Sequence, residues 1–294
     1  MKREIGIVGL GIMGGAMARN LMAAGWAVSG TDPNEGSARA LAAEGVVLHP
    51  DAGSLARGAP VVLTSLPTAA ALHAVAEAIA GSGAPPRVVV EASTMALDDK
   101  LAFEATLRAA GHIALDCPIS GTGAQAVRKD LVVYASGDTA AIAELGPLFE
   151  GFARAAHDLG AYGNGSRMKF VANLLVAIHN VASAEAMVLG MKAGLDPAQI
   201  VTLIGAGVGT SRVFDLRAPM MAADDYAAAT MKVSVWQKDM AVITAFADQV
   251  GASVPLLAAT VPIYDAAMAA GLGAEDTASV CRIIESMSGL VRRA

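Results

Sequence analysis

Three glycines near the start of the chain, Gly9, Gly11 and Gly14, have the spacing G-x-G-x-x-G. They follow an apolar run of strand length and lead directly into a helix-forming segment. In this context the first glycine permits a tight turn, the second lets the backbone approach a pyrophosphate, and the third lets helix and strand pack closely. The free N–H groups at the start of the helix then face the phosphates. The predicted dinucleotide-binding residues are Gly9, Leu10, Gly11, Ile12, Met13 and Gly14.

Asp32 ends the second predicted strand and bears on which dinucleotide is bound. A carboxylate at this position accepts hydrogen bonds from the adenosine ribose hydroxyls and repels a 2′-phosphate. The residues that follow are Pro33, Asn34 and Glu35 rather than an arginine, and Glu35 adds negative charge. A turn cap beside Pro33 is the alternative role for Asp32. We expect NAD as the cofactor, with NADP less favoured.

Lys169 and Asn173 are four residues apart at the start of a long predicted helix, so both point from one face of it, with Asn180 further along roughly the same stripe. A lysine in a first turn is usually a solvated charge, and the helix dipole disfavours it there. However, Lys169 follows Gly163-Asn164-Gly165 at an expected domain boundary, where clefts form. This position makes it a candidate site residue.

A second candidate segment runs from Asp116 to Gly123 and follows a predicted strand. It supplies several backbone N–H groups and the hydroxyls of Ser120 and Thr122, which suit a bound carboxylate. A glycine-rich connection between a strand and a helix accounts for the same residues equally well, so the residues alone leave both interpretations open.

Lys238 and Asp239 form a third candidate pair. They lie in the middle of a predicted helix among apolar residues. Two such neighbours are ordinarily an exposed ion pair. The sequence around them is equally compatible with a role in a functional site.

Composition excludes several classes of protein. The net charge of −6 and the pI of about 5.4 argue against a nucleic-acid partner, because phosphate binding needs a basic surface. The chain is 54% hydrophobic, but we find no run of about 18 apolar residues, and we expect neither a membrane span nor a signal peptide. Two cysteines and five scattered histidines indicate a reducing, cytoplasmic location, no disulfide framework and no metal site.

The order of elements that must position these residues predicts an α/β fold with two domains. The first half alternates strand-like and helical segments, which is typical of a Rossmann-type parallel sheet. After Gly163 the sequence pattern becomes entirely helical, beginning with one predicted helix over residues 166–194. We therefore predict a dinucleotide-binding domain over residues 1–163 and an all-α substrate and oligomerisation domain over residues 164–294. The expected strands are 5–9, 27–31, 46–49, 61–66, 88–91, 114–117, 131–135 and 155–158, and the expected later helices are 197–203, 231–250, 254–270 and 275–292.

Taken in order, these segments resemble the 3-hydroxyisobutyrate dehydrogenase family, the β-hydroxyacid dehydrogenases that include tartronate semialdehyde reductases. The family's G-L-G-x-M-G opening is similar to residues 9–14, and its D-A-P-V-S-G-G segment to residues 116–122. Its G-x-G-x-x-x-K-x-x-x-N segment is similar to residues 163–173, and its K-D-L segment to residues 238–240. The resemblance covers essentially the whole chain.

The resemblance implies a role for each residue. Lys169 is then the catalytic lysine and Asn173 its partner on the substrate. Lys238 approaches the nicotinamide, and Asp239 orients it. The expected substrate residues are Ser120, Gly121, Thr122, Lys169, Asn173 and Asp239, and the further cofactor residues are Leu66, Pro67, Thr94 and Lys238.

The implied activity is hydride transfer between NAD(H) and a small 3-hydroxy acid or its semialdehyde, with Lys169 as general acid and base. An imine reductase of the same architecture is one alternative, which Lys169 argues against. A catalytically silent dinucleotide-binding module is another. Relatives of this kind are commonly dimers or tetramers, so we expect a homo-oligomer that acts on a small carboxylate.

Two departures from the family pattern lie near the expected substrate. Thr122 replaces the second glycine of the carboxylate cradle, and residues 127–130 (Val-Arg-Lys-Asp) replace a segment that usually carries a glycine before the next strand. The threonine adds a hydroxyl and a methyl group. We expect it to favour a substrate with a polar substituent, such as a 2-hydroxyl, over the methyl of 3-hydroxyisobutyrate.

Overall fold

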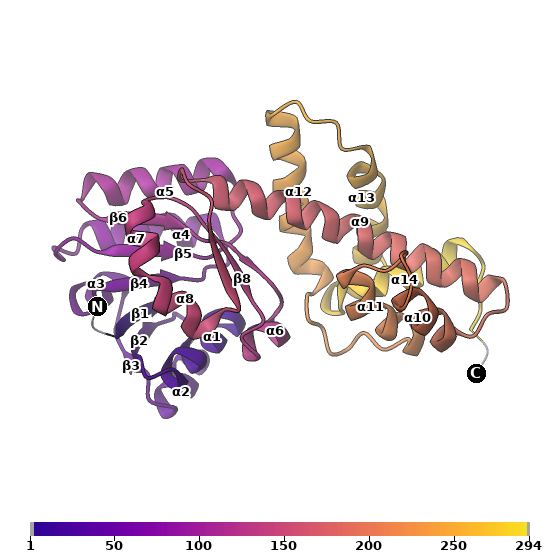
Figure 1. Cartoon of the computed structure of the whole chain (residues 1–294), viewed down its shortest axis with the longest axis horizontal. Helices are drawn as coiled ribbons and strands as arrows, with labels where there is room; N and C mark the ends of the chain where they lie inside the picture. The colour runs from indigo at the N-terminus through magenta and orange to yellow at the C-terminus, as the bar shows by residue number, and fades with distance from the viewer. Residues whose placement is uncertain (1–2, 293–294) are drawn as a thin grey trace. The chain divides into compact units, whose positions relative to one another are not determined.

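The computed structural model describes residues 3–292. The chain divides into two compact units, Met1–Lys169 and Phe170–Ala294. The first is an α/β unit and the second is entirely helical, which confirms the predicted fold class (Figure 1). The units divide six residues after the predicted boundary at residue 163, because one long helix begins in the first unit and continues into the second.

Six parallel strands form the main sheet of the first unit, in the order β3-β2-β1-β4-β5-β6. The strand order reverses between β1 and β4, and in open α/β sheets ligands bind at the carboxyl ends of strands where this happens. Valine, isoleucine and leucine dominate the central strands because helices cover both faces of the sheet. The strands are β1 (Glu4–Val8), β2 (Ala27–Thr31), β3 (Val47–Leu48), β4 (Val61–Thr64), β5 (Val88–Glu91) and β6 (Ile113–Asp116), and the helices are α1 (Ile12–Ala23), α2 (Glu35–Ala43), α3 (Ala52–Gly58), α4 (Ala69–Ala80) and α5 (Leu97–Ala109).

A second, three-stranded sheet completes this unit and corrects the prediction of one parallel sheet. Strand β7 (Ile119–Ser120) pairs antiparallel with β8 (Val132–Ala135), and β8 pairs parallel with β9 (Ala155–Asp158). The two-residue strand β7 and the short helix α6 (Gly123–Val127) were not predicted, since neither is long enough to give a periodic pattern. Helices α7 (Thr139–Glu144) and α8 (Gly146–Phe152) lie between β8 and β9 in the chain.

Helix α9 (Asn164–Lys192) is the long helix labelled in Figure 1. It has the predicted length of 29 residues and starts two residues earlier than expected. By length and composition alone it is apolar enough to cross a membrane, with a mean hydropathy of 1.6 over 18 residues, which the sequence analysis did not anticipate. Core helices of soluble proteins pass the same test, so this is weak evidence for a span. The side chains of Lys169, Asn173 and Asn180 on this helix are buried.

The remaining helices of the second unit are α10 (Pro197–Gly205), α11 (Arg212–Ala223), α12 (Val233–Gln249), α13 (Pro255–Ala269) and α14 (Val280–Met287). Helix α11 was missed because Pro219 lies inside it and interrupts the helical pattern. The predicted helix over residues 275–292 is too long at both ends. Residues Thr277–Ser279 form a 3₁₀ turn, and the α-helix extends only over Val280–Met287.

Candidate functional site

The loop between β1 and α1 has the conformation that the glycine pattern predicts. Gly9 has a φ of +91°, and a Cβ built on it would lie 2.1 Å from the carbonyl oxygen of Ser65. A Cβ on Gly14 would lie 1.8 Å from the carbonyl oxygen of Gly9. Both positions therefore require glycine, one for the turn and the other for close packing of helix on strand.

Gly11 differs, because a Cβ added to it would meet no atom of the described residues within 4 Å. The residue is exposed, and among residues 3–292 no side chain caps the N-terminus of α1. Open space above a backbone that ends in uncapped N–H groups fits a pyrophosphate. The neighbouring side chain of Ile12 is 79% exposed, so this apolar residue lies at the surface of the loop rather than in the core.

The carboxylate of Asp32 is held at the end of β2 by two backbone N–H groups. Leu10 N donates to Oδ2 over 2.6 Å, and Asn34 N donates to Oδ1 over 2.7 Å. The second bond is the turn-capping contact considered as the alternative role. A carboxylate has about four acceptor positions, so the two oxygens retain capacity for ribose hydroxyls.

Leu66, Pro67 and Thr94 lie in the loops that follow β4 and β5, at the same carboxyl edge of the sheet. Leu66 N donates to the hydroxyl of Ser93 over 2.7 Å, so the two loops are joined directly. Within the first unit the structure thus brings together the expected cofactor residues that precede Lys169 in the chain.

The expected carboxylate cradle follows β6 and packs against the dinucleotide loop. A Cβ on Gly123 would lie 2.5 Å from Cγ2 of Ile12. Gly121 has a φ of +140° and leaves no room for a side chain beside Leu131. Thr122 N donates to Oε1 of Gln125 over 3.0 Å as part of a capping box on α6, so this donor is already used within the protein.

A buried ion cluster that the sequence analysis missed lies beneath these loops. Lys100 on α5 forms ion pairs with Glu91 and, over 3.0 Å, with Oδ1 of Asp116, and all three side chains are 0% exposed. Burial alone would lower the pKa of Lys100, but the two carboxylates outweigh it and raise that pKa above the usual value for lysine. The local sequence Leu97-Asp98-Asp99-Lys100 is typical of an exposed helix start, so it gave no signal.

The first turn of α9 is attached to this cluster. Ser166 donates to Asp116 twice, from its N–H to Oδ2 over 2.7 Å and from its hydroxyl to Oδ1 over 2.8 Å. Gly165 N donates to the hydroxyl of Ser136 over 2.9 Å. A Cβ on Gly165 would lie 2.3 Å from the carbonyl oxygen of Tyr134, so the helix start packs directly on backbone. Lys169 follows one turn later and is 8% exposed.

In the second unit, Asn173 and the Lys238–Asp239 pair are linked. Asn173 Nδ2 donates to Oδ2 of Asp239 over 3.0 Å, and Nζ of Lys238 lies 3.7 Å from Oδ1 of the same carboxylate. Asn173 and Asp239 are buried, whereas the Lys238 side chain is 38% exposed. Asn180 has a different environment: it donates to the hydroxyl of Tyr264 and to the carbonyl of Thr277, both in the helical core.

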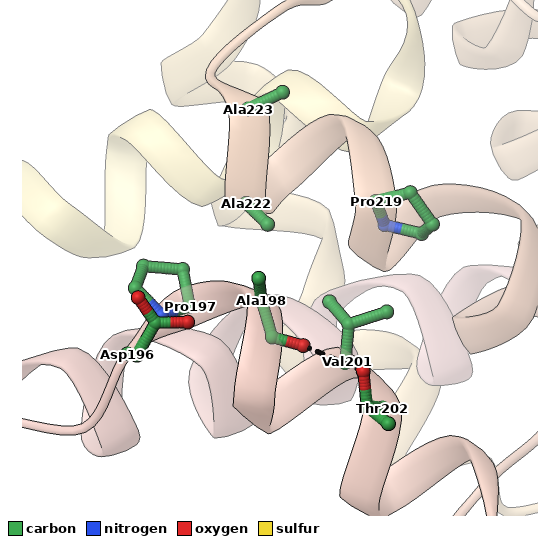
Figure 2. Close-up of a pocket in the computed structure, with 8 residues that line it drawn as sticks. All are labelled: Asp196, Pro197, Ala198, Val201, Thr202, Pro219, Ala222 and Ala223. Atoms are coloured by element: carbon green, nitrogen blue, oxygen red, sulfur yellow. Dashed lines mark hydrogen bonds between the residues drawn. The ribbon is translucent and has the colours of Figure 1, made fainter.

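A surface cavity of about 530 Å³ lies between α10 and α11 (Figure 2). Its walls are mostly alanine, proline and valine, and none of the predicted site residues lines it. Across residues 3–292 no group of three or more histidine, cysteine or acidic side chains is arranged to hold a metal ion. Cys117 and Cys281 are buried free thiols, and burial raises the pKa of both, that of Cys281 to about 12.

Comparisons with known proteins agree with this division of the chain. Residues 4–163 match the family model described as the NAD-binding domain of 6-phosphogluconate dehydrogenase. Residues 163–284 match the model described as NAD-binding of NADP-dependent 3-hydroxyisobutyrate dehydrogenase. Together the two matched segments cover nearly all of the described residues.

Named relatives span almost the full length of the chain. L-threonate dehydrogenase of Cupriavidus necator is 31% identical over 96% of both proteins. 2-(Hydroxymethyl)glutarate dehydrogenase of Eubacterium barkeri is 27% identical over 98% of this chain and 96% of its own length. A solved structure of 3-hydroxyisobutyrate dehydrogenase from Mycobacterium tuberculosis with L-serine covers 97% of this chain and 99% of its own, with 28% identity and a TM-score of 0.88.

Proposed function

The chain belongs to the 3-hydroxyisobutyrate dehydrogenase family of NAD(P)-dependent hydroxyacid dehydrogenases, and from this premise we propose that it transfers a hydride between NAD(H) and a small 3-hydroxy acid or its semialdehyde. The observation that carries the proposal is the placement of Lys169. Its helix start is held by the buried carboxylate of Asp116, and the side chain is 8% exposed although it bears a titratable amine. Lysine side chains are almost never buried unless they form an ion pair or take part in a functional site.

The proposed chemistry assigns the proton to Lys169. A dinucleotide held by the loop Gly9–Gly14 would supply the hydride acceptor for oxidation of the carbinol carbon and the hydride donor for the reverse reaction. In the oxidation direction the neutral amine of Lys169 accepts the hydroxyl proton as the C–O bond becomes a carbonyl. In the reduction direction the ammonium returns that proton and stabilises the developing alkoxide. Asn173, four residues later on α9, lies on the same helix face and donates its amide to the same substrate oxygen.

We propose NAD as the preferred dinucleotide because of Asp32. Its carboxylate is fixed at the end of β2 by Leu10 N and Asn34 N. A 2′-phosphate beside a fixed carboxylate would be repelled, and ribose hydroxyls would be bound. Gly9–Gly14, Leu66, Pro67 and Thr94 form the rest of the proposed dinucleotide site, and we assign Lys238 to the same role.

The proposed substrate is a short carboxylate with a polar group at C2. Ser120, Gly121 and the side chain of Thr122 hold its carboxylate, since the N–H of Thr122 is bonded to Gln125, and Asn173 and Asp239 complete the proposed substrate set. L-Threonate, the substrate named for one relative, is a four-carbon hydroxylated acid, and L-serine, present in the solved relative, is a 3-hydroxy acid with a polar C2 substituent. Both fit the expectation drawn from Thr122.

We further propose a cytoplasmic homodimer or homotetramer. Both cysteines are free thiols, as in a reducing compartment. Large apolar side chains of the helical unit, such as Leu189, Leu203 and Leu256, are more than 60% exposed, and association would cover them. Light scattering at micromolar protein concentration tests this, and a mass of one chain of 29.6 kDa would reject it.

The proposed function is tested by Lys169→Ala. The wild type is assayed with NAD⁺ and NADP⁺ against L-threonate, 3-hydroxyisobutyrate and L-serine, and in reverse with small semialdehydes. We expect Lys169→Ala to lower kcat by at least about 100-fold, the scale of general acid–base catalysis. Dinucleotide affinity, measured by fluorescence titration, should stay within a few-fold. Arg167→Ala, an exposed residue of the same helix turn, is the matched control. Wild-type turnover in Lys169→Ala would refute the assignment.

A further inference from the structure

The Lys100 cluster joins parts of the first unit that are far apart in sequence but close to the proposed chemistry. Lys100 bridges Glu91, the last residue of β5, and Asp116, the last residue of β6. Each carboxylate then receives hydrogen bonds from a different loop. The cluster thus lies where the carboxyl ends of the central strands meet.

The hydrogen bonds that Asp116 accepts hold the start of α9 in place. Its two carboxylate oxygens accept the N–H and the hydroxyl of Ser166, and its backbone carbonyl accepts the N–H and the hydroxyl of Ser136. Ser136 in turn accepts Gly165 N. The N–H groups at the start of a helix have no partner within it, and an anion is favoured there by the helix dipole. Asp116 therefore fixes both the position and the direction of the first turn.

The Glu91 branch controls the cofactor loops. Its Oε1 accepts Ser93 N over 3.0 Å and the hydroxyl of Thr64 over 3.4 Å. Ser93 then receives Leu66 N. The same lysine therefore holds one carboxylate that orders the loops after β4 and β5, and another that orders the helix start.

Two buried carboxylates that share one cation do not both stay ionised once that cation is removed. If Lys100 is removed, one carboxylate takes up a proton or draws in water, and the geometry of its partners changes. Lys169 lies three residues after Ser166, on the same helix face, so a displacement of that turn moves its side chain directly. A shift of about 1 Å at a reacting group can lower a rate by about 100-fold.

We propose that Lys100 is a positioning residue: by fixing Asp116 it holds Ser166 and the first turn of α9, and so sets the position of Lys169. The expected effect on catalysis rests on the proposed function. The attachment of the α9 start to Asp116, which we call the clamp, can be measured without any activity assay. Lys100, Glu91 and Asp116 do not touch the substrate in this scheme.

The test compares Lys100→Met and Ser166→Ala with a control of matched stability. Ser166→Ala removes one hydroxyl bond to Asp116 and leaves the ion pairs in place. Phe103→Leu, at a fully buried position on the same α5 helix, perturbs packing without touching the cluster. Amide hydrogen exchange is followed for residues 164–170. We expect exchange there to rise at least about 10-fold in both cluster variants and to stay near the wild-type value in Phe103→Leu.

The catalytic arm uses double mutants with Lys169→Ala, assayed on the substrate with the highest kcat/KM in the panel above. We expect Lys100→Met to lower kcat about 10-fold or more and Ser166→Ala about 3- to 10-fold, with smaller changes in dinucleotide affinity. In the Lys169→Ala background neither change should lower kcat further, because the effect on kcat passes through the amine that is already gone, whereas a displacement of the cofactor loops held by Glu91 would change dinucleotide affinity.

Each outcome decides a different claim. If Lys100→Met lowers kcat by the same factor with and without Lys169, or if exchange at residues 164–170 is unchanged, the positioning role is overturned. A further outcome is that Lys169→Ala retains wild-type turnover while amide exchange at residues 164–170 still rises in Lys100→Met and Ser166→Ala. In that case the structural role of Lys100 stands and the proposed function fails. If Lys100→Met does not fold, Ser166→Ala and its double mutant give the same decision.

Discussion

Asn173 Nδ2 donates a hydrogen bond of 3.0 Å to Oδ2 of Asp239, although the two residues are 66 positions apart in the chain. Both side chains are buried, and both belong to motifs that the sequence analysis selected separately. The carboxylate also lies 3.7 Å from Nζ of Lys238, so it contacts both neighbours at once. Asp239 therefore holds the amide of Asn173 and also lies beside Lys238, the lysine that we expect it to orient.

We expect Asp239→Ala to lower kcat/KM by about 10-fold or more, because a free amide at Asn173 no longer holds one orientation. It should also lower the free energy of unfolding by about 1–3 kcal/mol, the effect of leaving a buried amide unpaired. Asp248→Ala, an exposed carboxylate on the same helix, is the control and should change neither quantity. Equal effects of Asp239→Ala with Asn173 present or replaced by alanine would contradict the coupling.

Cofactor choice should follow Asp32. We expect wild-type kcat/KM to favour NAD(H) over NADP(H), and Asp32→Ser with Pro33→Arg to relax or reverse that preference, because the change replaces a repelling charge with an attracting one. Glu35→Gln removes a nearby exposed charge and should shift the preference less. A wild type that prefers NADP(H) would contradict this assignment before any variant is made.

Substrate preference should depend on Thr122. We expect higher kcat/KM on hydroxylated three- or four-carbon acids than on 3-hydroxyisobutyrate, and Thr122→Gly to narrow that gap, since a site that bonds a hydroxyl penalises analogues without one. Glycine is tolerated at the start of α6, at a cost of a few tenths of a kcal/mol. Thr122→Ser keeps the hydroxyl and should keep the preference. Equal or better kinetics of the wild type with 3-hydroxyisobutyrate would rule out this role.

Lys129 has a φ of +58°, in the left-handed region that favours glycine. It follows α6 in a Schellman-type end: Lys129 N donates to the carbonyl of Ala126, and Asp130 N to that of Gln125. We expect Lys129→Gly to raise the free energy of unfolding by about 0.5–1 kcal/mol, as relief of strain outweighs the added freedom of the unfolded chain. Lys129→Ala, which removes the charge and keeps the strain, should show no gain in the same urea titration.

Acid should weaken the helical unit through Asp276. Burial acts to raise the pKa of Asp276, but Arg217 and hydrogen bonds from Ala278, Thr230 and Met231 outweigh it and lower the pKa below the usual value. A carboxylate with a depressed folded pKa stabilises the fold above its unfolded pKa and loses that contribution as pH falls through the folded value.

We therefore expect Asp276→Asn to be less stable than the wild type by about 3 kcal/mol at pH 7, because it leaves Arg217 buried without its partner. The difference should shrink below about pH 4, where the carboxyl group of Asp276 in the unfolded chain begins to take up a proton while the folded one stays ionised. Urea titrations of both proteins at several pH values measure this. A difference that stays constant from pH 7 to pH 3 would show that the charge of Asp276 is not the cause.

The sequence predicted those parts of the molecule that short-range patterns encode. Gly9 and Gly14 predict a turn and a close contact, and the long stretch without strand-like alternation after Gly165 predicts α9. These features could be predicted because they depend on residues close together in the sequence. Lys100 gave no such signal. Its burial follows from Glu91 and Asp116 on two other strands, and a lysine after two aspartates in a first turn has the pattern of a solvated helix start.

The second sheet and the end of the chain were mispredicted for related reasons. Strand β7 is two residues long, and its pairing with β8 depends on a chain reversal that no periodicity records. Residues 275–292 have helical composition, but the side chain of Asp276 accepts Ala278 N and fixes a tighter turn there. Side-chain bonds to the backbone compete with regular helix in this way.

The attachment of α9 to Asp116 and Ser136 also orders events during synthesis. The acceptors for Gly165 N and Ser166 N precede their donors by 29 and 50 residues, so they leave the ribosome first. The sheet that carries them can already be folded when the helix start emerges, since chains fold from the N-terminus during translation. A fragment that begins at residue 164 would lack these acceptors, and its first turn, with Lys169, would fray.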